Sequence, residues 1–382
     1  MEFALDYPGG DAVVLAVIDH QHAFWPTMFG AGAGNFLGVS APAVEVTPGV
    51  RKAEVKLAVV QSRGPQPEGC TGDRMELVRL AAPDVAGSIG NDTSRRLCVL
   101  LPPSYAKDPS RRYPVVYLLP GFASDDSAYL RGNNDVRPKV DALAASGGGG
   151  GEAIVVGVDT STKHGSTYFT DSAAGGQWNA FVPKMVSEID RRYRTRPDAK
   201  SRAVVGHSTG GFNAVSLALR HPDLFTVIGA SAPDGLDFEA WLTSADHRVR
   251  PMWLAWSRLE SAVGGIGQIL SYAAAWSPPA EVFPFDLDSG VMNASPWAKW
   301  QAQSPMRMLD DATFVETLRR VLGGRIFLTV GKADEFGLHE PTLLFDARLT
   351  ELRIPHQLTV TEGGHDSKNV QPVLLLAIGA MK

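Results

Sequence analysis

The strongest constraint on the fold is an alternation of apolar runs and helical patterns that fills the chain from about residue 73 to its end. Short, continuous apolar runs of this kind are typical of buried strands: "RRLCVLLPP", "YPVVYLLPGF", "EAIVVGVD", "SRAVVGHS", "FTVIGASAPDG", "GRIFLTVGKADEF" and "HQLTVTEGGHD". Helical patterns lie between them; Trp178, Phe181, Met185 and Ile189, for example, recur at three- and four-residue spacing. We therefore predict an α/β fold in which a mostly parallel central sheet carries helices on both faces.

Two segments depart from this alternation, one before it and one within it. Residues 1–72 contain β-like runs between Pro and Gly clusters, which predict a small β-rich N-terminal unit. The second segment, about 235–305, follows a strand's carboxyl end, where open α/β sheets place their ligand crevice. Six of the eight tryptophans lie there, namely Trp241, Trp253, Trp256, Trp276, Trp297 and Trp300. We interpret this insertion as a helical cap. Its tryptophans either fill the cap itself or form one wall of an apolar pocket, and we favour the pocket.

Composition and charge exclude several classes of protein. The net charge of −5 gives no basic footprint for nucleic acid, and no apolar run approaches the roughly 20 residues of a membrane span. The start "MEFALDYPGG" lacks a basic n-region, so we expect a cytoplasmic protein unless a leader has been removed. Cys70 and Cys98 are too few for a disulfide scaffold, and we interpret Cys98, within "RLCVLL", as a small buried core residue.

A serine lies between two glycines where an apolar run meets a helical pattern. The segment Gly206-His207-Ser208-Thr209-Gly210 fits G-x-S-x-G, which between a strand and a helix marks a nucleophile on a sharp turn. A side chain at Gly206 or Gly210 would collide with the neighbouring strand or helix. Strained backbone at Ser208 would project its hydroxyl, and the helix N-terminus favours developing negative charge. We therefore predict that Ser208 is a nucleophile.

A serine nucleophile needs a base, and the base needs an orienting acid. Asp334 follows one apolar run, and His365 follows the last one in a glycine-bearing loop. Serine, acid and histidine then occur in the order that this motif requires, each at a strand's carboxyl end. We predict that Ser208 attacks a carbonyl group, that His365 is the general base and then acid, and that Asp334 orients the imidazole. Glu335 is the alternative acid; we favour Asp334 because it comes sooner after the strand.

The negative charge formed during such an attack needs two preorganised donors, usually backbone N–H groups. One donor is expected from Thr209, which follows the nucleophile. The other is expected from the turn after "VVYLLPGF", where Phe122 follows Gly121. We therefore predict an oxyanion hole formed by Phe122 and Thr209.

Four other polar residues receive simpler interpretations. His207 adjoins Ser208, so we expect its side chain to point elsewhere, and we interpret Asp366 as a solvated or loop-capping residue. His20 and His22 share one face of a strand-like run but lack a third convergent ligand. We therefore predict no metal site.

Several sequence blocks together resemble a known family. "YPVVYLLPGF", "GGQWNAFVPKMVSEIDRRYRT", "AVVGHSTGGFNAVSLALRHPDLF", "ASAPDGLDF", "GKADEFGL" and "EGGHDS" resemble the putative-esterase branch of the α/β-hydrolase superfamily, over roughly residues 74–382. That branch includes S-formylglutathione hydrolases, feruloyl esterases and enterobactin esterases. The resemblance implies an α/β-hydrolase catalytic domain over residues 73–382, with Ser208, Asp334 and His365 at the triad positions. Two positions depart from the pattern: Pro120 stands where many members have histidine, and Ser367 stands where many have an aromatic residue.

The resemblance and the cap also suggest residues of the substrate pocket. Trp178 begins a helix whose packing explains it well, but the corresponding residues of the family line the substrate side. Together with Trp253 and Trp256 of the cap, Trp178 is a predicted substrate-binding residue.

The chain is thus predicted to be a serine esterase that acts through an acyl-enzyme and needs no cofactor. Its partner would be a small-molecule or polymer-linked ester, and the protein would be a monomer or a weak oligomer. One alternative is an acyltransferase that uses the same acyl-enzyme but accepts an alcohol in place of water. The other is a non-catalytic binding protein on a hydrolase fold.

Overall fold

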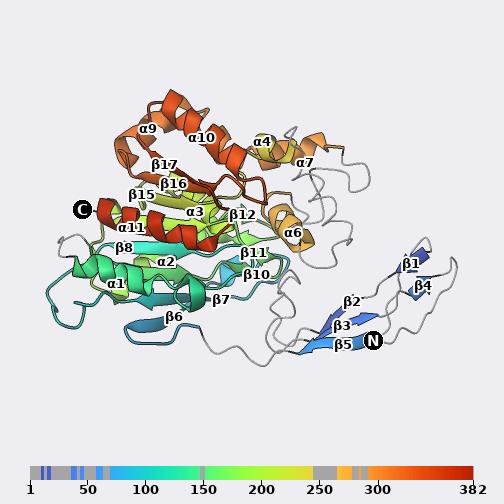
Figure 1. Cartoon of the computed structure of the whole chain (residues 1–382), viewed down its shortest axis with the longest axis horizontal. Helices are drawn as coiled ribbons and strands as arrows, with labels where there is room; N and C mark the ends of the chain where they lie inside the picture. The colour runs from blue at the N-terminus through green and yellow to red at the C-terminus, as the bar shows by residue number, and fades with distance from the viewer. Residues whose placement is uncertain are drawn as a thin grey trace.

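The structure of the chain is a computed structural model, drawn in Figure 1. It describes residues 69–146, 151–243, 265–277, 284 and 291–381, together with the backbone of five short strands before residue 63.

An eight-stranded sheet forms the centre of the fold (Figure 1). Its strand order is β17-β16-β15-β14-β8-β9-β7-β6. The strands are β6 (Met75–Ala81), β7 (Ser94–Leu100), β8 (Val115–Leu119), β9 (Ile154–Val158), β14 (Arg202–His207), β15 (Val227–Ser231), β16 (Ile326–Gly331) and β17 (Gln357–Thr361). All neighbours from β17 to β9 pair in parallel, whereas β7 and β6 add an antiparallel edge. The predicted, mostly parallel sheet is confirmed.

Helices cover both faces because each central strand is apolar on both sides. Along β8, Val115, Tyr117 and Leu119 belong to one buried cluster, whereas Val116 and Leu118 belong to another. The first cluster includes side chains of α2 (Trp178–Arg192) and α3 (Thr209–Arg220), and the second includes those of α1 (Arg137–Ala145) and α11 (Val370–Ala380). Figure 1 shows α1 and α11 side by side over one face.

Further helices belong to the cap and the region after it. They are α4 (Phe238–Thr243), α6 (Gly265–Trp276), α7 (Ala294–Gln301), α8 (Pro305–Met308), α9 (Ala312–Leu322) and α10 (His339–Glu351). Two short hairpins, β10–β11 (Ser161–Thr162, Gly165–Ser166) and β12–β13 (Asp171–Ser172, Gly176–Gln177), precede α2.

Three of the four described cap tryptophans are buried in the core, and the fourth, Trp297, is partly buried against it. Trp241, Trp276 and Trp300 are 3%, 4% and 0% exposed, and the rings of Trp276 and Trp300 lie 5.6 Å apart. For these three residues the structure supports the interpretation in which the tryptophans fill the cap itself, rather than the pocket wall that we favoured. Trp253 and Trp256 lie outside the described residues.

The first 62 residues contain the strands β1 (Gly10–Ala12), β2 (Leu15–Ile18), β3 (Phe36–Ser40), β4 (Val44–Val46) and β5 (Leu57–Ser62). Among the strands that the structure describes, they pair with one another alone, as an antiparallel β1–β4 pair and an antiparallel β2–β3–β5 sheet. The division into an N-terminal unit and a larger domain at residue 72 stays a prediction.

A disulfide corrects the interpretation of Cys98. Its side chain is fully buried, as expected, but it is bonded to Cys70, 28 residues earlier, with a Cα–Cα distance of 5.4 Å. The bond joins the segment before β6 to β7, the strand that pairs with β6. Cys70 lies just before β6, and the sequence pattern did not reveal β6, so the pairing of the two cysteines was not predicted.

Candidate active site

Ser208 lies on a strained turn between β14 and α3. Its backbone has φ 57° and ψ −126°, a left-handed conformation that side chains rarely adopt outside functional sites. A Cβ at Gly206 would lie 2.2 Å from the carbonyl oxygen of Gly210, and a Cβ at Gly210 would lie 2.2 Å from that of Leu119. The predicted reason for both glycines is confirmed: the turn brings a strand and a helix too close for side chains.

Asp334 and His365 form the pair that the sequence predicted. The Nδ1 atom of His365 lies 2.8 Å from Oδ2 of Asp334. Asp334 follows β16, and its side chain is fully buried. The other carboxylate oxygen accepts the backbone N–H groups of Phe336 and Leu338, at 3.0 and 3.3 Å. With Nδ1 engaged, Nε2 is the nitrogen available to exchange protons.

The two neighbouring acids have other partners. Glu335 accepts the backbone N–H of His365 at 2.7 Å, so it holds the loop rather than the ring. Asp366 accepts the backbone N–H of Lys368 and caps a short 3₁₀ helix, Ser367–Asn369, which confirms its interpretation as a loop cap.

The ring of His365 lies between two other rings. Its centroid is 4.5 Å from that of His207 and 4.8 Å from that of Phe336. The ring of His207 points away from the Ser208 hydroxyl, as expected: it is buried, packs against His365, and has Nδ1 3.1 Å from Oγ of Ser231. Burial, and then the nearby charge of His365, keep the pKa of His207 well below its ordinary value. His207 is thus a neutral ring that supports the imidazole.

Ser208 has a partner that the sequence analysis missed. Its hydroxyl donates to Oδ1 of Asp234 at 3.2 Å. Among the described residues it makes no hydrogen bond to His365. Burial raises the pKa of Asp234, while hydrogen bonds, chiefly from Thr209 and Tyr272, oppose that rise. One signal was available: Asp234 follows β15, which runs parallel to β14, so both strands deliver residues to the same edge of the sheet.

The predicted oxyanion turn lies against the nucleophile. A Cβ at Gly121 would lie 3.6 Å from Cβ of Ser208, so the turn and the serine are in close contact. The turn is held by the N–H of Ala123, which donates to Oγ of Ser166 at 3.3 Å. Within the described part of the chain, the N–H of Phe122, the next residue, has no hydrogen-bond acceptor. That donor is therefore available for an anion.

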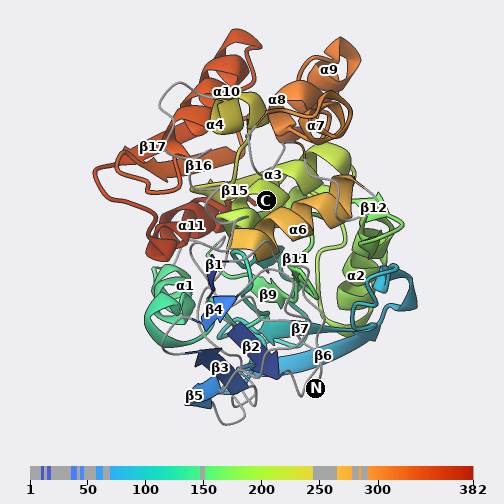
Figure 2. The ribbon, with the colours of Figure 1, turned by 90° about the vertical axis from the view of Figure 1, so that its right-hand side faces the viewer.

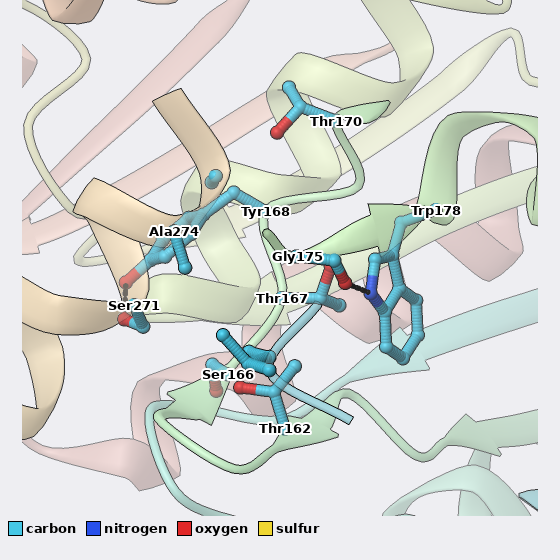
Figure 3. Close-up of a pocket in the computed structure, with 11 residues that line it drawn as sticks. Thr162, Ser166, Thr167, Tyr168, Thr170, Gly175, Trp178, Ser271 and Ala274 are labelled. Atoms are coloured by element: carbon cyan, nitrogen blue, oxygen red, sulfur yellow. Dashed lines mark hydrogen bonds between the residues drawn. The ribbon is translucent and has the colours of Figure 1, made fainter. Parts of the chain in front are cut away.

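Trp178 lies in the core beside a small cavity, shown in Figure 3. Its indole is 1% exposed and donates to the carbonyl oxygen of Gly175 at 2.8 Å. The cavity, of about 10 Å³, has room for about one water molecule. Packing therefore accounts for Trp178, and its predicted role in binding substrate gains no support.

Among the described residues, no group of three or more His, Cys, Asp or Glu side chains could hold a metal ion. His20 and His22 lie outside the described residues. The described helices include none with the length and apolar character of a membrane span.

Comparison with known proteins shows the family to which the chain belongs. The profile of the family described as "Putative esterase" matches residues 88–375, about three quarters of the chain. This chain belongs to the esterase family. Esterase Rv1288 of Mycobacterium tuberculosis is 25% identical over 283 residues, which are 70% of this chain and 51% of that protein. The chain thus spans about half the length of the curated relatives it matches.

Solved structures show that the fold is the α/β-hydrolase fold of esterases. A ferulic acid esterase aligns with a TM-score of 0.56 and 20% identity, over 80% of this chain and 97% of that one. An S-formylglutathione hydrolase from Staphylococcus aureus aligns with a TM-score of 0.51 and 15% identity, over 80% of this chain and 98% of that one. Both likenesses concern the fold, which confirms the predicted fold class.

Proposed function

We propose that this member of the esterase family hydrolyses a carboxylic ester, with Ser208 as nucleophile, His365 as general base and Asp334 as the orienting acid. The observation that carries the proposal is the Asp334–His365 pair, joined at 2.8 Å. The ring of His365 packs on the ring of His207, the residue before Ser208. A strained serine, an oriented imidazole and free backbone donors are the parts that acyl transfer needs.

The reaction would proceed in two halves. The Ser208 hydroxyl attacks the ester carbonyl carbon while Nε2 of His365 takes its proton, and the N–H groups of Phe122 and Thr209 hold the resulting oxyanion. The intermediate collapses as the alkoxide leaves with the proton from His365, which gives an alcohol and an acyl-enzyme. Water then attacks the acyl-enzyme, His365 takes and returns its proton, and a carboxylic acid is released. The carboxylate of Asp334 stabilises the imidazolium in both halves.

The substrate is a small-molecule or polymer-linked ester, and the α/β-hydrolase unit over residues 73–382 carries the reaction. Each proposed catalytic group comes from the loop after a strand of the central sheet, with no group from residues 1–72. The oxyanion turn follows β8, Ser208 follows β14, Asp334 follows β16 and His365 follows β17.

Substitution of the serine tests the proposal. Ser208→Ala should abolish covalent labelling by a fluorophosphonate probe and lower kcat for p-nitrophenyl acetate by at least about 10⁴-fold. Ser216→Ala is the matched control, since Ser216 is buried on α3, the helix that follows Ser208, and its Oγ has no hydrogen-bond partner among the described residues. We expect that variant to label normally. A Ser208→Ala protein that is folded and still labelled would place the nucleophile elsewhere.

A further inference from the structure

Asp234 is a buried carboxyl group with an unusual set of partners. It is 2% exposed, and four side chains donate to it. Oδ1 accepts the Ser208 hydroxyl, and Oδ2 accepts Thr209 Oγ1 at 2.6 Å, Tyr272 OH at 2.8 Å and Gln268 Nε2 at 3.1 Å. Hydroxyl and amide groups supply these four hydrogen bonds, and the nearby charge of His365 also favours the carboxylate form.

The backbone that brings Asp234 to Ser208 is strained on both sides. Ala232, two residues before Asp234, has φ 39°, and Ser208 has φ 57°. The N–H of Asp234 donates to the carbonyl oxygen of Ser208 at 3.1 Å. Strained non-glycine residues persist only where the surrounding structure holds them, and they cluster at functional sites. The contact is thus fixed through main chain as well as side chain.

The contact with Asp234 competes with catalysis. The Ser208 hydroxyl has one proton, and while it donates to Asp234 it cannot donate to His365. Hydrogen bonds to a charged acceptor are about twice as strong as neutral ones. We propose that Asp234 is a positioning residue whose carboxylate holds the Ser208 hydroxyl in the resting protein, and that Tyr272 of the cap sets how firmly it is held. This inference rests on the proposed role of Ser208 as nucleophile.

The cap contributes two of the donors to Asp234 through α6, which carries both Tyr272 and Gln268. Figure 2 shows α6 crossing in front of α3. Each hydrogen bond that Oδ2 accepts disperses the negative charge of Asp234, which would otherwise strengthen the hydrogen bond from Ser208. While Asp234 is ionised, loss of the Tyr272 hydroxyl should therefore tighten the hold on Ser208, whereas loss of the Asp234 charge should release it. A residue of merely structural importance would slow the reaction in both cases.

The first experiment measures the second-order rate constant of fluorophosphonate labelling at pH 8. Asp234→Asn keeps the size of the side chain but removes its charge, so labelling should be about three- to tenfold faster than in the wild type. Asp237→Asn is the matched control: Asp237 lies in the same loop, and its carboxylate accepts the backbone N–H groups of Glu239 and Ala240 instead. We expect its labelling rate to equal that of the wild type.

The second experiment tests a substitution that should change the labelling rate in the opposite direction. Tyr272→Phe should label about three- to tenfold more slowly than the wild type, and this effect should disappear in the Asp234→Asn background. Tyr117→Phe is the control, because Tyr117 is a fully buried tyrosine whose hydroxyl bonds no described residue. It should label at the wild-type rate. Tyr272→Phe also tests the inference by itself if Asp234→Asn fails to fold.

Each result has one meaning. Faster labelling of Asp234→Asn together with slower labelling of Tyr272→Phe supports the inference. An unchanged rate in Asp234→Asn means that the serine is not held in solution, and a slower rate means that the carboxylate assists the attack. Both results overturn the inference. Labelling that survives Ser208→Ala refutes the proposed function instead, so the two failures are distinguishable.

Discussion

Two adjacent carboxylates, Asp334 and Glu335, hold the same histidine in different ways. Asp334 bonds the ring at Nδ1, whereas Glu335 bonds the backbone N–H of His365. Asp334→Asn would present an amide to the ring and favour the wrong tautomer, so kcat should fall by about 10³- to 10⁴-fold. Glu335→Gln keeps an oxygen that can accept the N–H, and its kcat should fall by about tenfold or less. Steady-state hydrolysis of p-nitrophenyl acetate compares the two.

Glu335→Gln is a close control for Asp334→Asn, since both replace an acid by its amide at neighbouring positions. Equal losses of kcat in the two variants would contradict the assignment of Asp334 as the acid that acts on the ring. A large loss in Glu335→Gln alone would assign that role to Glu335.

The strand–turn–helix element around Ser208 depends on close backbone packing. A Cβ at Gly210 would lie 2.2 Å from the Leu119 carbonyl oxygen and 2.5 Å from that of Pro120, so β8 and the oxyanion turn would have to move. Gly210→Ala should therefore abolish fluorophosphonate labelling and lower the free energy of unfolding by about 3 kcal/mol or more. Labelling and denaturant unfolding measure the two effects.

Gly379→Ala is the matched control for that element. Gly379 lies in α11, and a Cβ there would meet nothing within 4 Å. Alanine is favoured over glycine in a helix, so this variant should gain up to about 1 kcal/mol and keep full labelling. Normal labelling by Gly210→Ala would show that the turn tolerates a side chain.

Sequence patterns predicted the elements that are buried on both sides and missed those that are not. β8, β9 and β14 are continuous apolar runs and were predicted, whereas β6 is an edge strand of mixed exposure with no such run. At the site, the chain order of Ser208, Asp334 and His365 carried the prediction. Asp234 and His207 were missed because their contacts arise from strands that become neighbours only in the folded sheet.

At the scale of the whole molecule, an ion pair links the antiparallel edge of the sheet to the segment after the oxyanion turn. Arg96 of β7 lies 2.5 Å from Asp126, which follows that turn and is 3% exposed. Burial raises the pKa of Asp126 to about 6, opposed by Arg96 and assisted by the negative charges of Asp159 and Asp125. The folded protein therefore binds a proton at Asp126 more tightly than the unfolded chain does.

That difference makes the stability of the protein depend on pH. Because the pKa of Asp126 rises on folding from an ordinary 3.8 to about 6, its contribution to stability is complete below about pH 4 and is lost as the pH rises through 6. The wild type should thus lose up to about 3 kcal/mol relative to Asp126→Asn between pH 4 and 7. Denaturant unfolding of both proteins across this range isolates the effect, since the contributions of the other titratable groups are the same in both proteins and cancel in the difference.

Asp108→Asn is the control. Asp108 is exposed, and a hydrogen bond from Ser110 lowers its pKa, so the difference in stability between this variant and the wild type should stay constant from pH 5 to 8. A constant difference for Asp126→Asn as well would show that Asp126 titrates as it does in the unfolded chain.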